Sequence, residues 1–175
     1  MGAYVLNADE LAKELMVKDP TVKQELVDVF GDASYSDDGS LNRQYLADEA
    51  FEKGRVDELN AIVHPRMPDA AKEKLKRAAA DGYTVFVYEA ALRLENLEQR
   101  DLDYVVLVLA DMQHRLKRVQ QRDDSTEDEI LQRMNKQRDF EQATDRVDYV
   151  IRNNGTLEEL EKKAEVIYQN FTNTG

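Results

Sequence analysis

The chain contains no cysteine and no tryptophan, and it has only three prolines among 175 residues. Without cysteine it has no disulfide and no thiolate metal site, which favours a cytoplasmic protein. Long hydrophobic runs are also absent: the longest, Val105–Ala110, is far too short to span a bilayer. No basic residue precedes an apolar stretch at the N-terminus. Neither a membrane segment nor a signal peptide is therefore predicted.

The chain has fewer basic than acidic residues, with 24 Lys and Arg and 36 Asp and Glu, and its net charge is -12. A nucleic-acid-binding protein is usually basic, so no nucleic-acid partner is expected. Binding of a phosphate group would need a local cluster of Arg and Lys or a helix N-terminus. One locally basic segment runs from Arg115 to Arg122. Taken alone, this segment is more typical of a solvated helix face.

Apolar runs alternate with helical patterns along the chain. The runs Tyr4–Leu6, Tyr83–Tyr88, Tyr104–Leu109 and Val147–Ile151 predict strands, and the later ones have almost no polar break, as in strands buried on both faces of a parallel sheet. The stretch 10–80 is nearly all helical in pattern, and it is too long for a plain crossover. We therefore predict an α/β fold whose core is formed by residues 1–9 and 81–175, with an inserted helical domain at 10–80.

Several short strings follow one another in a fixed order. They are Gly2-Ala-Tyr-Val-Leu-Asn-Ala-Asp9, Asp38-Gly39-Ser40-Leu41-Asn42-Arg43, Leu59-Asn60 with His64-Pro65, Glu89-Ala90-Ala91-Leu92, Arg115-Leu-Lys-Arg118 with Arg122-Asp123, and Asp148-Tyr-Val-Ile151 with Asn153 and Gly155. In this order and spacing they resemble the dephospho-coenzyme A kinase family, from residue 2 to about residue 170.

The resemblance implies a reaction, ligands and a fold. The reaction is transfer of the ATP γ-phosphoryl group to the ribose 3′-hydroxyl of dephospho-coenzyme A, the last step of coenzyme A biosynthesis, with Mg²⁺ as cofactor. The fold is a P-loop kinase core, with a parallel sheet covered by helices on both faces. The helical domain at 10–80 then binds the coenzyme A substrate, and residues from about 113 to 140 form a helical lid.

One expected element has no counterpart in this sequence. Kinases of this kind begin with a strand, a G-x-x-x-x-G-K-[ST] loop and a helix, and the sequence contains no such string. We expect the first central strand and the P-loop to be missing, whether by natural truncation, a mistaken start codon or design. The loss predicts little or no kinase activity, and unpaired strands that favour self-association.

The resemblance also implies roles for acidic residues. Asp9 matches the family's catalytic aspartate, which accepts or orients the ribose hydroxyl proton. Its alternative role is to cap the helix that starts near Glu10. Asn7 stands where the family usually has another acid, which puts a metal role there in doubt. Glu89 lies at a strand end and is either a water-mediated Mg²⁺ ligand or a loop residue.

Three residues of the helical domain are candidates for binding the substrate. Arg43 would pair with a substrate phosphate, or else form a surface salt bridge. Asn60 belongs to the same block, and His64 either contacts the substrate or ends its helix, with Pro65 stopping it.

Three arginines of the lid, Arg115, Arg118 and Arg122, would close over the nucleotide phosphates. Arg133 and Gln137 are weaker candidates for the same role.

Two other functions stay open at this point. A non-catalytic module would keep the helical domain and bind dephospho-coenzyme A, or bind a protein partner through unpaired strands. A different small-molecule kinase would share the architecture, but the His64-Pro65 and Asp38–Arg43 strings argue against it.

Overall fold

The computed structural model describes residues 2–90, 102–123, 126–135 and 140–173. The chain divides into two compact units, Gly2–Ala91 and Leu92–Gly175. Each unit has most of its contacts within itself. The division expected from the sequence, into a core of residues 1–9 and 81–175 and an inserted helical domain at 10–80, stays a prediction.

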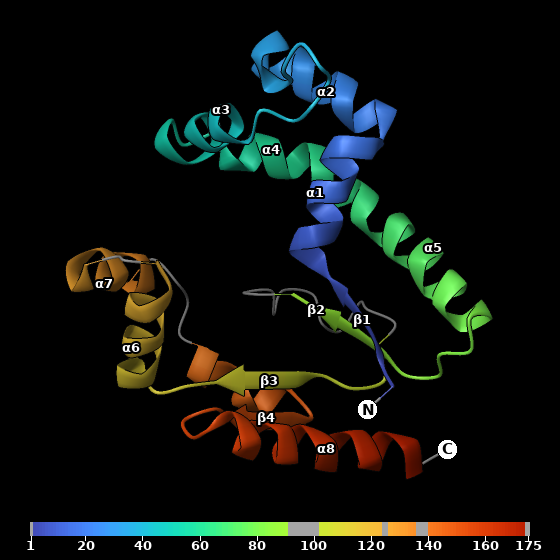
Figure 1. Cartoon of the computed structure of the whole chain (residues 1–175), viewed down its shortest axis with the longest axis vertical. Helices are drawn as coiled ribbons and strands as arrows, with labels where there is room; N and C mark the ends of the chain where they lie inside the picture. Colours follow the sequence, from blue (N-terminus) through green and yellow to red (C-terminus); the bar gives the residue numbers. More distant parts are fainter. Residues whose placement is uncertain (1, 91–101, 124–125, 136–139, 174–175) are drawn as a thin grey trace. The chain divides into compact units, whose positions relative to one another are not determined.

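Parallel strands form one pair in each unit (Figure 1). In the first unit β1 (Tyr4–Asn7) pairs with β2 (Phe86–Glu89), and Asn7 lies opposite Glu89. In the second unit β3 (Val106–Leu109) pairs with β4 (Tyr149–Arg152). The predicted α/β class with parallel strands is confirmed.

The single predicted sheet is observed as two separate two-stranded sheets. Among the described residues, β2 pairs only with β1, and β3 only with β4. The second strand also starts later than predicted. The reason is local: the backbone N–H of Tyr83 donates to the carbonyl of Ala78 at 3.1 Å and so closes the preceding helix instead of joining a strand ladder.

The predicted helical stretch 10–80 is confirmed. Its regular segments are α1 (Ala8–Lys18), α2 (Pro20–Phe30), α3 (Arg43–Ala47), a π-helical turn (Asp48–Glu52), α4 (Val56–Val63) and α5 (Met67–Ala80). Local chemistry sets the start of α2, because the Asp19 carboxylate accepts from the N–H groups of Thr21 and Val22 at 2.8 and 3.0 Å. Pro20 then occupies the first helical position, where no N–H is needed.

The hydrophobic core of the first unit lies between these helices and β1. Val22 and Leu26 on α2 are 0% exposed. The other buried residues of this cluster are Leu6, Ala8, Leu11, Phe30, Leu46, Ile62, Val63 and Met67. Tyr35 ties the loop after α2 to α1, since its hydroxyl donates to the Met16 carbonyl at 2.7 Å.

A π-helical turn follows α3 within the predicted helical stretch. The N–H of Lys53 donates to the carbonyl of Asp48, five residues earlier, at 3.0 Å. Glu49 points inward and is 6% exposed, whereas Phe51 is 70% exposed. The Arg55 guanidinium accounts for the buried charge, because it donates to Glu49 at 2.7 Å and also covers the Phe30 ring.

The second unit contains α6 (Met112–Asp123), α7 (Glu127–Asn135), a 3-10 segment (Phe140–Arg146) and α8 (Leu157–Asn173). Helix α8 contacts β4, and the Phe171 ring stacks on Tyr104 with centroids 4.5 Å apart. A capping box starts α8, since Thr156 and Glu159 exchange hydrogen bonds of 3.1 and 3.3 Å. None of the described helices is long and apolar enough to cross a membrane.

Candidate functional site

The carboxyl end of the β1–β2 pair carries three polar side chains. Asn7 and Glu89 end the two strands and lie opposite each other in the register. The Asn7 side-chain N–H donates to the Glu89 carboxylate, and the Asn7 side-chain oxygen accepts from the Glu10 N–H at 2.9 Å. Asn7 is therefore the N-cap of α1. The capping role considered for Asp9 is wrong, because α1 begins one residue before it.

Asp9 lies in the first turn of α1 and is exposed. Its carboxylate stands at the N-terminal end of a helix that starts directly after a parallel strand. The partial positive charge of that helix end favours an anionic side chain there. Ligands of parallel α/β sheets bind outside the carboxyl ends of the strands, so Asp9 is at the expected edge.

Arg43 belongs to the same unit and brings positive charge toward this helix turn. It is the first residue of α3, where the Asn42 side chain caps the helix by accepting from the Tyr45 N–H at 3.2 Å. A hydrogen bond from Lys13 holds the pKa of the Glu10 carboxyl below its usual value, and the Arg43 charge adds to the effect. An exposed cation is thus close to the residue that follows Asp9.

Asn60 and His64 lie one helical turn apart at the end of α4. The His64 backbone N–H donates to the Asn60 carbonyl and so caps the helix. Both residues are half-buried. Nearby, Arg66 donates to the Ile62 carbonyl at 2.8 Å and pairs with Glu25 at 2.6 Å. This backbone hydrogen bond closes the end of α4, and the side chains of Asn60 and His64 therefore lie on one short segment.

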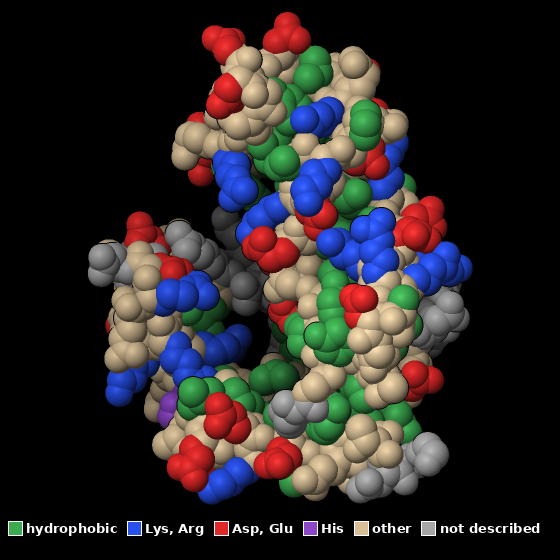
Figure 2. Space-filling view, turned by 45° about the vertical axis from the view of Figure 1, so that its right-hand side comes forward, with side chains coloured by type: hydrophobic (Ala, Val, Ile, Leu, Met, Phe, Trp, Pro, Cys, Tyr) green, Lys and Arg blue, Asp and Glu red, His purple; other side chains and the backbone are tan. Residues whose placement is uncertain are grey.

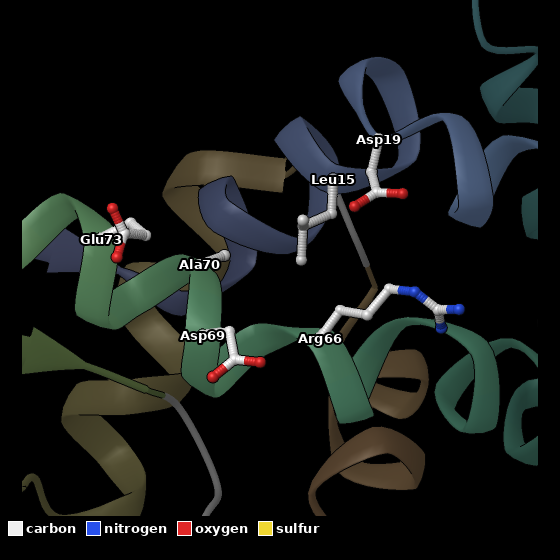
Figure 3. A pocket seen from close by; sticks show the side chains of 6 residues that line it. All are labelled: Leu15, Asp19, Arg66, Asp69, Ala70 and Glu73. Carbon is white, nitrogen blue, oxygen red and sulfur yellow. The ribbon is translucent and has the colours of Figure 1, made fainter.

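Two adjoining hollows of about 280 and 300 Å³ lie along α1 and α5. They share Leu15, Asp19 and Ala70, and Figure 3 shows the Arg66 side chain extending away from Asp69. None of the predicted site residues lines either hollow. Some of the charged residues that line the hollows are already paired, as in the Lys74–Glu14 ion pair. We therefore take the strand end, and not these hollows, as the candidate site.

The three lid arginines are in different surroundings on α6. Arg118 is fully engaged: its guanidinium donates to the carbonyl and side-chain oxygens of Asn153 at 2.7 and 3.3 Å, and to the Gly155 carbonyl at 3.3 Å. Arg122 pairs with the neighbouring Asp123 at 2.6 Å. Arg115 is exposed. Figure 2 shows Lys and Arg side chains gathered over the part of the molecule that α6 forms.

Arg118 joins α6 to the turn that follows β4. That turn also binds the end of β3, since Asn153 N–H donates to the Leu109 carbonyl at 2.7 Å. The Asn154 side chain accepts from the Asp111 N–H at 2.8 Å. The predicted lid helix is thus fixed at its base to the carboxyl end of β3–β4.

One ion pair at this strand end was missed by sequence reasoning. Arg152, the last residue of β4, donates to both carboxylate oxygens of Glu141 at 2.6 Å. Arg152, with a smaller contribution from Arg115, holds the pKa of Glu141 below its ordinary value. The only sequence signal is a charged residue at the end of an apolar strand.

Three further candidates lie wholly or partly outside the described residues or have a side chain that is not described. Gln137 and the Ala91-Leu92 part of the predicted loop lie outside the described residues. Arg133 belongs to α7. Among the described residues, no group of three or more His, Asp or Glu is placed to hold a metal ion. Glu89, which ends β2 and accepts from the Asn7 side chain, stays the candidate for a water-mediated Mg²⁺ ligand.

Solved structures share this architecture. A crystal structure from Thermus thermophilus aligns with a TM-score of 0.75 and 28% identity, covering 97% of this chain and 85% of that one. A dephospho-CoA kinase from Campylobacter jejuni aligns with a TM-score of 0.70 over 99% of this chain and 87% of that one, and at 19% identity it supports the fold alone. The chain is therefore an α/β protein with the architecture of these structures.

Sequence comparison then gives the family. The family model for dephospho-CoA kinase matches residues 1–159. A dephospho-CoA kinase of Salinibacter ruber is 40% identical over 168 residues, which cover 95% of this chain and 84% of the relative. One of Chlorobaculum tepidum is 37% identical, over 98% of this chain and 84% of the relative. The chain belongs to the dephospho-CoA kinase family, as the resemblance indicated.

Proposed function

We propose that this chain carries the substrate-binding part and lid of a kinase that phosphorylates dephospho-coenzyme A at the ribose 3′-hydroxyl. The observation that carries the proposal is the position of Asp9. It is exposed, it has no capping role, and it lies two residues beyond the carboxyl end of β1. A carboxylate there is placed to accept a proton from a hydroxyl bound at the strand edge.

In the proposed reaction the ribose 3′-oxygen attacks the γ-phosphorus of ATP. Its proton passes to the Asp9 carboxylate, the bond between the γ-phosphorus and the β,γ-bridging oxygen breaks, and ADP leaves. Catalysis of this type depends on positioning and on stabilising the charge of the transferring group. Mg²⁺ would supply part of that stabilisation when it is bound, and Glu89 is the residue that would hold it through water.

The remaining candidates divide between substrate and nucleotide. Arg43 is proposed to pair with a phosphate of dephospho-coenzyme A, because it is exposed and its charge reaches the first turn of α1. Asn60 and His64 are proposed to contact the same substrate from the end of α4. Arg115 and Arg122 are proposed to meet the ATP phosphates, since a cation arriving there stabilises the transferred group.

The 175 residues contain no G-x-x-x-x-G-K-[ST] string. We therefore propose that the isolated chain binds dephospho-coenzyme A without appreciable turnover, because the backbone cradle for the β- and γ-phosphates is not among these residues. Among the described residues, β2 pairs only with β1 and β3 only with β4. Val5 and Val87 on the first pair are 62% and 41% exposed, so these surfaces favour self-association at high concentration.

The test has a binding part and a turnover part. Calorimetry should show that the purified chain binds dephospho-coenzyme A more tightly than it binds coenzyme A, whose 3′-position is already phosphorylated. No binding of dephospho-coenzyme A would overturn the proposed substrate class. Self-association is checked by sedimentation across a concentration series.

The turnover part asks whether Asp9 acts as the base. The chain alone should form no coenzyme A, and fusion to a strand–loop–helix segment carrying G-x-x-x-x-G-K-[ST] should restore product formation. In that fusion, Asp9→Asn should lower kcat about 100-fold or more, whereas Glu10→Gln, next to it and already paired with Lys13, serves as the matched control. Equal loss in both variants would contradict the role of Asp9. A fusion that binds substrate without turnover would favour a non-catalytic module.

A further inference from the structure

Phe51 is an aromatic side chain that the helical stretch leaves open to solvent. Among the large hydrophobic side chains that the structure describes, Phe51 and Leu157 are the most exposed, at 70% each. On the same segment as Phe51, Leu46 and Ala50 are 4% and 1% exposed and belong to the inner face. Single exposed apolar residues are common on protein surfaces, so exposure alone assigns no role to Phe51. The residues on its side of the helix give the further information.

The π-helical turn sets the side of the helix on which Phe51 lies. Four residues turn an α-helix by about 40° more than one full turn. A π turn holds about one residue more than an α turn, so four of its residues stop short of a full turn. The step from Arg43 to Ala47 is α-helical, and the step from Ala47 to Phe51 runs through the π turn, so the two offsets nearly cancel. Arg43 and Phe51 are therefore in line on one exposed side, at most about 12 Å apart along the axis.

Arg43 connects this exposed side with the first turn of α1. A hydrogen bond from Lys13 is the main cause of the lowered pKa of Glu10, and the charge of Arg43 is a smaller one. Arg43 thus lies within electrostatic reach of the residue that follows Asp9. A cation near the proposed base and an open aromatic ring further along the same side of the helix are the two features of this surface.

We propose that Phe51 is a substrate-binding residue, whose ring stacks on the adenine base of dephospho-coenzyme A while Arg43 pairs with the diphosphate of the same molecule. The inference rests on the proposed function, because it names how the proposed substrate is held. Bases stack on exposed aromatic rings, and loss of such a ring weakens binding about five- to 150-fold. The pantetheine arm of the substrate has neither an aromatic ring nor a charge, so the pair of features fits the nucleotide end.

The absence of tryptophan from the chain provides a direct test. Phe51→Trp places a single indole at the proposed site, and a base stacked on it should quench its fluorescence when dephospho-coenzyme A is added. ADP carries the same base and diphosphate and should also quench the fluorescence, whereas pantetheine should not. Val17→Trp is the matched control, because Val17 is 37% exposed and lies about two turns beyond Glu10 on α1. Its fluorescence should stay unchanged with all three ligands.

Calorimetry then measures what the ring contributes to affinity. Phe51→Ala should bind dephospho-coenzyme A at least about fivefold more weakly than the wild type. Its thermal midpoint should stay close to that of the wild type, because the side chain removed is exposed. Phe51→Tyr keeps an aromatic ring and should bind within about twofold of the wild type.

The outcomes separate this inference from the proposed function. If the wild type does not bind dephospho-coenzyme A, the proposed function fails, and the stacking role fails with it. If the wild type binds and Phe51→Ala binds equally well, only the stacking role is overturned. Equal losses of affinity in Phe51→Ala and Phe51→Tyr would overturn it too, and so would quenching by pantetheine without quenching by ADP.

Discussion

Substitution of Leu26 by alanine should destabilise the first unit strongly. Leu26 is 0% exposed on α2, and it belongs to the cluster that joins α2 to β1, α4 and α5. The carbon atoms removed are worth about 0.8 kcal/mol each in transfer free energy, or about 2.4 kcal/mol in total. The cavity left behind adds to this and brings the expected loss to about 3–4 kcal/mol.

Urea denaturation followed by circular dichroism measures this loss. With a denaturant slope of about 1.5–2 kcal/mol per molar urea, the midpoint should fall by about 2 M. Val29→Ala is the matched control, because Val29 lies on the same helix and is 40% exposed. Its expected loss is below about 1 kcal/mol.

The comparison between the two variants tests whether α2 packs with Leu26 buried and Val29 facing solvent. A loss below about 1 kcal/mol for Leu26→Ala would refute the described core. So would equal losses for Leu26→Ala and Val29→Ala, since one side chain is enclosed and the other faces solvent.

Three further predictions concern ionisable groups. Burial raises the pKa of Tyr35 to about 12, so the stability that its neutral phenol contributes is complete below about pH 10 and is lost as the pH rises toward 12. In urea denaturation, the free energy of unfolding should therefore fall more steeply at alkaline pH for the wild type than for Tyr35→Phe. Parallel falls in the two proteins would contradict this. Arg118→Lys should speed amide hydrogen exchange at Asn153, because one ammonium cannot reach all three oxygens, and unchanged exchange would argue against the clamp. Arg152 lowers the pKa of Glu141, so the stabilising contribution of the ionised carboxylate is present above about pH 4.5 and is lost as the pH falls. In Glu141→Gln, the free energy of unfolding should depend less on pH in the acid range. An unchanged dependence would count against this.

Much of the fold follows from local patterns in the sequence. The apolar run at residues 104–109 predicts a buried strand, and β3 lies inside it. Its predicted burial is wrong, because Val106 and Val108 are 37% and 54% exposed. Thr156 and Glu159 predict the start of α8, because a capping box uses only residues within one turn. Such signals are readable because the interacting atoms are close in sequence.

The start of α1 shows where local patterns are insufficient. Asn7 and Asp9 are both good capping residues, and sequence alone does not say which one precedes the helix. The choice depends on β1 continuing as far as Asn7, and that follows from pairing with β2, about 80 residues later.

The surroundings of Arg118 could not be predicted for a similar reason. A basic run on a helix predicts either a solvated face or a phosphate site. The three oxygens that Arg118 binds belong to a turn 35 and 37 residues away. Only the folded second unit brings that turn to α6.

The π-helical turn at Asp48–Glu52 has a consequence for how chain length is tolerated here. A π turn holds one residue more than an α turn, and one residue advances a helix by about 100°. Deleting one residue within 48–52 would turn the segment into ordinary α-helix and rotate what precedes it relative to α4. Glu49 would then face away from Arg55, and their ion pair would be lost. The π turn therefore makes the Glu49–Arg55 ion pair sensitive to a change of one residue in chain length at this place.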